Sequence, residues 1–135
     1  MAFAETAQDR RVLEGINPFS VTLAEAVHAG DPLGISGGTW VLSASATVEQ
    51  PIAIAAENGA VGETITAYTM AVVECVTTSS TYATVGEKVA VSDTGYYMAA
   101  TADYPDVGFV ASIGGLVTAI VFLCPCAAQL TVVRA

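Results

Sequence analysis

The chain has 135 residues, a length typical of one domain, and its formal net charge is −9. The only basic residue between Val12 and Val133 is Lys88, so no cationic track could follow a phosphate backbone, and nucleic-acid binding is not expected. Charged residues make up only 13% of the chain, against about 25% in a typical globular protein. So few charges predict that other copies of the chain, or another protein, cover part of its surface.

Residues 1–19 are predicted to form an extended N-terminal arm. They contain two of the four basic residues, show no strand alternation and lead into Asn17-Pro18, which favours a turn or extended backbone. One or two helical turns within Thr6–Glu14 would be too short for independent stability. Because Phe3 and Phe19 suit a partner surface better than a solvated tail, we expect the arm to dock on a partner; the alternative is a frayed terminus.

Residues 20–135 are predicted to fold as a single all-β domain, because short runs of β-formers alternate with turns rich in Gly, Asp and Ser. A small β-barrel and a β-sandwich both fit, and periodicity does not separate them. A short helical turn is compatible with Thr22–Ala29, and Thr77–Thr84 is expected to be an exposed loop. The expected strands are Ser20–Leu23, Pro32–Ser36, Thr39–Ala44, Ile52–Ala56, Thr64–Val76, Lys88–Ser92, Tyr96–Ala100, Gly108–Ala111, Val117–Leu123 and an edge piece at Gln129–Val133.

A Gly-acid motif recurs at Ala29–Leu33, Val61–Ile65 and Val85–Val89. Each instance gives a small or β-branched residue, Gly, an acid, a variable residue and an apolar residue, and each opens a run of β-formers. Gly in such a turn supplies a positive φ at little cost, so each motif predicts a turn followed by a strand.

Two of these motifs belong to a longer alignment at an offset of 56 residues, which places Trp40 on Tyr96 and assigns both rings to core or subunit packing. The aligned segments are 29–44 with 85–100, and 51–55 with 107–111. We therefore predict that the domain contains an internal pseudo-repeat. Its two copies span 29–59 and 85–115.

Val107–Ala128 is uncharged and about long enough to span a bilayer. Its glycines, its proline and its β-branched residues instead favour two buried strands around a turn at Ile113-Gly114-Gly115. No secretory signal is expected, because Met1–Gly15 carries charges and lacks an apolar core. The sequence therefore predicts no membrane contact.

Few groups in the chain suit catalysis or metal binding. His28 is the single histidine, no Gly-x-Ser-x-Gly motif is present, and most acids lie in turns, where they accept local backbone hydrogen bonds. Cys124 and Cys126 are too close for an easy disulfide and Cys75 lies in an apolar run, so buried free thiols are expected, as in a reducing cytoplasm. We expect no enzyme activity, no catalytic residue, no metal and no cofactor.

Four segments together resemble the small capsid decoration, or cement, proteins of tailed bacteriophages. The segments are Ala29–Leu33, Pro51–Ile65, Val85–Val91 and Asp106–Ser112. The likeness covers about Ala29–Leu123 and depends on pattern rather than on rare residues. One departure is Ile52-Ala53-Ile54, where an Ile-Gly-Val-like segment would have Gly at the centre.

The resemblance implies a β-tulip-like homotrimer, made in the host cytoplasm, that binds the outer surface of the assembled phage capsid. It would stabilise the shell by clamping neighbouring copies of the major capsid protein, with the N-terminal arm reaching across to the shell. Two alternatives stay open: another virion β-module, such as a head-fibre base or tail component, and a soluble β-barrel module for a carbohydrate or other ligand. The expected capsid or subunit contacts are Phe3, Arg10, Arg11, Phe19, Trp40 and Tyr96.

Overall fold

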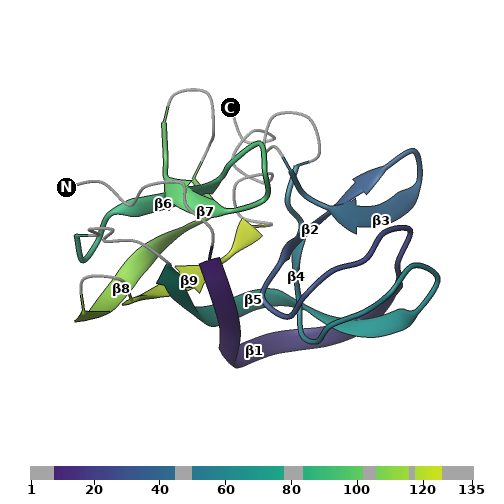
Figure 1. Cartoon of the computed structure of the whole chain (residues 1–135), viewed down its shortest axis with the longest axis horizontal. Coiled ribbons are helices and arrows are strands. Elements are labelled where there is room, and N and C mark those ends of the chain that lie inside the picture. The colour runs from purple at the N-terminus through teal and green to yellow at the C-terminus, as the bar shows by residue number, and fades with distance from the viewer. Residues whose placement is uncertain (1–7, 45–49, 78–83, 102–105, 116–117, 126–135) are drawn as a thin grey trace.

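The computed structural model describes residues 8–44, 50–77, 84–101, 106–115 and 118–125. They form one antiparallel sheet that curls into a half-barrel (Figure 1), which confirms the all-β fold class. The strands are β1 (Gln8–Thr22), β2 (Pro32–Ser36), β3 (Thr39–Leu42), β4 (Ala53–Ala55), β5 (Thr64–Thr77), β6 (Lys88–Val91), β7 (Tyr97–Ala99), β8 (Gly108–Gly115) and β9 (Thr118–Leu123). Their order is β3-β2-β4-β5-β9-β8-β6-β7, and β1 pairs with β5.

The long strand β5 organises this sheet. One of its edges pairs with β1 over its whole length, while the other pairs first with β4 and then with β9. The β1–β5 ribbon therefore supports two units, β2–β4 on the right of Figure 1 and β6–β9 on the left. Each unit has its own core: the first includes Val21, Leu23, Leu33 and Ile65, and the second includes Val73, Val89, Tyr97 and Val121.

The strand pairings follow the same scheme in the two units. In the first, β2 lies between β3 and β4, and β4 pairs with β5. In the second, β6 lies between β7 and β8, and β8 pairs with β9. The arrangement is the one that the pseudo-repeat leads us to expect, and a duplication as its origin stays a prediction.

All three Gly-acid motifs form the same turn. Gly30, Gly62 and Gly86 have φ values of 85°, 85° and 88°, and the N–H of each following acid donates to the carbonyl three residues earlier, as in a type II turn. In each motif the Gly N–H donates to the carbonyl of a residue in a neighbouring segment, and the N–H of that same residue donates to the carbonyl of the acid. The residue is Ala55 for the first motif, Leu23 for the second and Val110 for the third. The repeated motif is thus a turn whose backbone hydrogen bonds hold the start of a strand against a neighbouring segment.

The expectation of an N-terminal arm is wrong for residues 8–19, which form most of β1, and a helical turn is wrong for the described part of Thr6–Glu14. Polar residues at the inward positions hide the alternation, and a bulge at Leu13 interrupts it. Pro18 is tolerated because, among the described strands, β1 pairs with β5 alone and so lies at an edge. No α-helix forms over Thr22–Ala29 either, while residues 1–7 lie outside the described part of the chain.

The two units differ in one hairpin, and this corrects the alignment of Trp40 with Tyr96. The β2–β3 hairpin has a two-residue turn, whereas in the β6–β7 hairpin the N–H of Ser92 donates to the carbonyl of Tyr96 across a longer turn. Trp40 pairs with Ile35, and the residue paired at the matching position of β6 is Tyr97. One extra residue moves every later side chain to the opposite face, so the buried aromatic ring of the second unit is Tyr97.

Two further expectations in the second unit are corrected. The turn expected at Ile113–Gly115 is absent, because β8 continues through these residues and Ile113 and Gly115 pair with β9. The third strands of the units match at an offset of 55 rather than 56, since Ala53 pairs with Leu33 and Gly108 pairs with Val89. In the described residues no helix is long and apolar enough to cross a membrane. The expected strand at Gln129–Val133 and most of the loop at Thr77–Thr84 lie outside those residues.

Candidate functional site

The N-terminal end of β1 contacts the edge strand β7 through hydrogen bonds of one side chain, and the two backbones do not pair. The side-chain amide of Gln8 donates from Nε2 to the carbonyl of Tyr97 at 2.6 Å, and its Oε1 accepts from the N–H of Tyr97 at 3.1 Å. Beyond the other end of β1, the N–H of Ala24 donates to the carbonyl of Trp40 in β3 at 2.9 Å. β1 and the residues that follow it therefore contact the outermost strand of both units.

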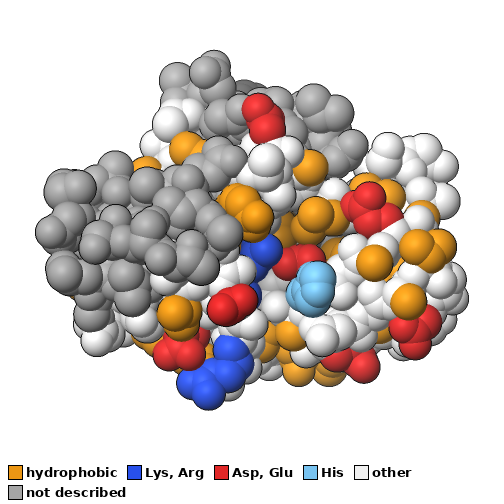
Figure 2. Space-filling model, viewed as in Figure 1, with side chains coloured by type: hydrophobic (Ala, Val, Ile, Leu, Met, Phe, Trp, Pro, Cys, Tyr) orange, Lys and Arg blue, Asp and Glu red, His pale blue; other side chains and the backbone are white. Residues whose placement is uncertain are grey.

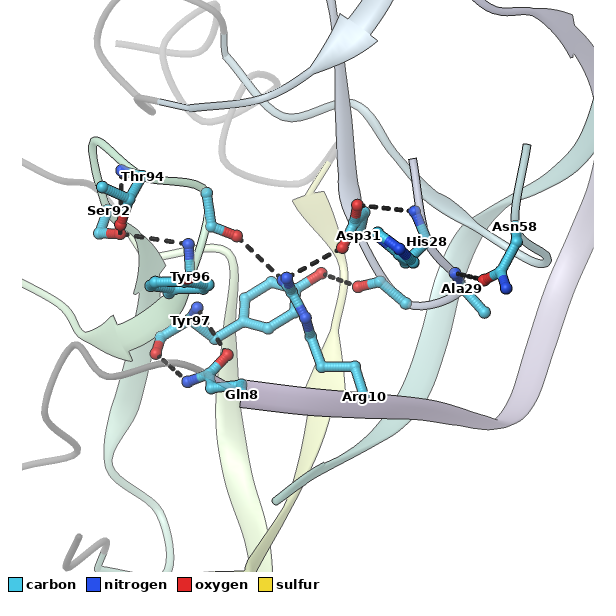
Figure 3. Close-up of polar contacts among 12 residues, drawn as sticks. Gln8, Arg10, His28, Ala29, Asp31, Asn58, Ser92, Thr94, Tyr96 and Tyr97 are labelled. Carbon is cyan, nitrogen blue, oxygen red and sulfur yellow. Dashed lines mark hydrogen bonds and ion pairs between the residues drawn. The ribbon is translucent and has the colours of Figure 1, made fainter. Parts of the chain in front are cut away.

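Arg10 spans the junction between the two units (Figure 3). Its Nη2 lies 2.9 Å from Oδ1 of Asp31, in the first Gly-acid turn, and its Nη1 donates to the carbonyl of Gly95, in the β6–β7 hairpin, at 2.9 Å. The guanidinium also lies 5.2 Å from the ring centroid of Tyr97. Because the Arg10 and Asp31 side chains are only 9% and 5% exposed, water screens this ion pair little.

Neighbouring groups hold the partners of Arg10 in place. Oδ2 of Asp31 accepts from the N–H of His28 at 2.9 Å, whereas Oδ1 has the Arg10 charge beside it but no aligned hydrogen bond from the described residues. The hydroxyl of Tyr97 donates to the carbonyl of Gly30 at 2.7 Å. Burial raises the pKa of Tyr97 well above its ordinary value of 10.0, so this hydroxyl keeps its proton at neutral pH.

A polar cleft of about 360 Å³ opens over this junction. Figure 2 faces it and shows acidic, basic and histidine side chains gathered around it. The residues that line it include Gln8, Asp9, Arg10, His28, Asp31, Asn58 and Tyr96. Several of these groups already bond to the protein, since Asn58 accepts from the N–H of Ala29 and Gln8 bonds Tyr97. The cleft is therefore the outer side of a structural network.

A second region is an apolar patch on the outward surface of β1, β5, β8 and β9, which we call the outer face. Its members are Ile16, Met70, Val72, Phe109 and Phe122. Phe109 and Phe122 are 47% and 46% exposed and stack on each other with their centroids 5.5 Å apart. A hollow of about 220 Å³ lies beside the pair, lined by Ile16, Met70 and Gly108 among others. Aromatic side chains that remain half exposed beside an apolar hollow are typical of binding surfaces.

The structure does not bring the expected contact residues together on one surface. Arg10 and Tyr96 lie at the junction, and Arg11 points outward beside Glu74 at 3.1 Å. The rings of Phe19 and Trp40 pack on each other, 5.8 Å apart, against the core of the first unit. Phe3 lies outside the described residues.

Sequence reasoning missed Gln8, Asp31 and Tyr97 at the junction and the whole outer face. Asp31 could have been noticed as the acid of the first Gly-acid motif. Its partner Arg10, however, lies 21 positions earlier, in the segment that was expected to form an arm. Phe109 and Phe122 lie in a stretch without charges, and strand alternation turns about half of the side chains of such a stretch outward. This was the signal for the outer face. No pattern within the chain indicated that these two strands pair with their phenylalanines side by side.

No family model and no curated protein matches the chain. Within the described residues, no group of three or more His, Cys, Asp or Glu side chains could hold a metal ion. The arrangement as described can position strands and present an apolar surface.

The stability of the protein is expected to fall as the pH rises above about 9. Burial raises the pKa of the Cys75 thiol from 9.0 to about 12, and burial likewise raises the pKa of Tyr97. The unfolded chain therefore releases these protons at a lower pH than the native protein, so the contribution of these groups to stability is fully present below about pH 9 and is lost as the pH rises toward about 12. Urea midpoints measured between these limits test this. Replacing Cys75 with alanine should flatten the decline, and a midpoint that does not change with pH would contradict the expectation.

Proposed function

We propose that this protein is a structural virion protein that binds the outer surface of an assembled phage capsid and stabilises the shell by clamping neighbouring capsid subunits. The likeness of Ala29–Leu123 to phage decoration proteins suggests the partner. Support that does not depend on this likeness comes from the distribution of polar and apolar groups over the described surface.

The observation that carries the proposal is that large apolar side chains are exposed on the described surface, while the polar groups at the junction bond within the fold. Val61 and Val85 occupy matching positions at the tips of two Gly-acid turns and are 67% and 60% exposed. The type II turn does not require a valine at this corner, so both side chains are available to a partner. Together with the outer face, they give the protein apolar surfaces suited to contact with other proteins or with further copies of itself.

Such a protein would act by summed weak contacts. Each copy needs only modest affinity, because a shell offers many equivalent sites and a copy that bridges two subunits opposes their separation. The charge of −9 does not favour contact with the packaged DNA, which agrees with a position on the outside of the shell.

The alternative of a carbohydrate-binding module needs an aromatic platform. The rings that could form one are Trp40, Tyr96, Tyr97 and Tyr104. Tyr97 is fully buried, Trp40 packs on Phe19, and Tyr96 lines the polar cleft beside Arg10. These three rings do not share a groove, and Tyr104 lies outside the described residues. No observation favours this alternative or a tail component over the capsid role.

A binding experiment with intact shells tests the proposal. The purified protein is mixed with expanded capsids of its own phage that lack it, and the shells are sedimented. We expect saturable binding at a fixed number of copies per capsid subunit, and release of DNA at a higher temperature from the decorated shells. Isolated capsid subunits serve as the control and should not bind. Protein that remains in the supernatant at every concentration would contradict the proposal.

A further inference from the structure

The outer face presents a row of side chains that crosses five strands. The registers pair Glu14 with Val72, Val72 with Phe122, Phe122 with Phe109, and Phe109 with Lys88. Directly paired residues of antiparallel strands project from the same side of a sheet, so these five side chains share one surface. The row has an acid at one end, two stacked rings near its centre and a base at the other end.

The charges at the two ends are accessible to a partner. With neighbouring strands about 4.8 Å apart, Glu14 and Lys88 lie roughly 19 Å from each other, too far for a contact within one chain. The Lys88 side chain is 70% exposed, and its contact with Asp106, at 3.8 Å between exposed groups, is of the kind that contributes little. Glu14 is exposed at the rim of the apolar hollow.

We infer that the outer face binds the outer face of a second copy of this chain around a twofold axis that passes near Phe122 and runs parallel to the strands, which gives a dimer in place of the homotrimer that the resemblance implies. Because this axis is perpendicular to the row, the rotation turns the row end for end, so that Glu14 of each copy faces Lys88 of the other. The stacked rings of Phe109 and Phe122 lie at the centre of the row, so the same rotation brings the apolar centres of the two copies together. The row is thus complementary to itself in charge.

The inference does not rest on the capsid role, because it concerns the purified protein without shells. The mass in solution, measured by light scattering across a range of concentrations, should be that of two chains. Phe122→Glu should raise the dissociation constant at least about tenfold, as for an aromatic anchor at the centre of an interface. Ile35→Glu, at a similarly exposed position on β2, is the matched control and should leave the dimer intact.

Exchange of the terminal charges gives a test that loss of folding cannot mimic. Glu14→Lys alone and Lys88→Glu alone should each weaken the dimer, because each sets like charges against one another across the axis. The double variant restores opposite charges at both ends and should restore the dimer. A monomer at every soluble concentration, a trimer, a dimer unaffected by Phe122→Glu, or a double variant no better than the single ones would overturn the inference.

Discussion

Replacing Arg10 with alanine is expected to lower the free energy of unfolding by about 3–5 kcal/mol, because the change leaves the Asp31 carboxylate buried without its cation. The carbonyl of Gly95 and the ring of Tyr97 lose the same guanidinium. Since these groups belong to different units, the loss should affect the whole sheet. Urea unfolding at neutral pH, followed by the fluorescence of Trp40, measures the effect.

The neighbouring residue provides a matched control for this prediction. Arg11 has the same chemistry on the same strand but points outward, where its side chain is 71% exposed beside Glu74. Arg11→Ala should therefore change the stability by no more than about 1 kcal/mol. If the two alanine variants were equally stable, the buried ion pair would not stabilise the junction between the units.

Replacing Gly108 with alanine is the second change for which we expect a large effect, a loss of about 3 kcal/mol or more. A Cβ at Gly108 would overlap the carbonyl oxygen of Phe122 in the paired strand β9. Backbone atoms held in a ladder cannot move aside as a flexible side chain can, so β8 and β9 would have to separate locally. Thermal or urea unfolding measures the loss, which should be accompanied by weaker stacking of Phe109 on Phe122.

Gly114 lies in the same strand and serves as the control. Its nearest neighbour to an added Cβ is Cγ2 of Thr118 at 3.4 Å, an ordinary van der Waals contact. Gly114→Ala should therefore leave the stability within about 1 kcal/mol of the parent. A Gly108→Ala variant as stable as Gly114→Ala would show that the close approach of the two strands at Phe122 is not required.

Most strands could be predicted from the sequence because their local signals agree with one another. Pro32–Ser36 lies between a Gly-acid turn and a Gly-Gly turn, and β2 has these same bounds. The expected strand Thr64–Val76 differs from β5 by one residue. It could be predicted because a long run in which alternate residues are buried is a strong period-two pattern. Turn chemistry and periodicity are local, so a single sequence carries them.

The remaining features depend on partners that are distant in the sequence. β1 was missed because Gln8 and Arg10 fill inward positions, and polar groups can do so only where Tyr97, Gly95 and Asp31 satisfy them. The sequence alignment matched Trp40 with Tyr96, whereas the structure matches it with Tyr97. The β6–β7 hairpin has one extra residue, and an alignment without gaps cannot show this. The outer face requires the pairing of β8 with β9, and such register is not contained in periodicity.

The amount of this protein in purified virus particles tests its proposed role most directly. Particles from its source are purified on a density gradient, and the protein is quantified relative to the major capsid protein. We predict a near-stoichiometric ratio, as expected for a protein that occupies equivalent positions over the whole shell. A few copies per particle would indicate a fibre or tail component instead, and complete absence from the particles would contradict the proposal that this is a virion protein.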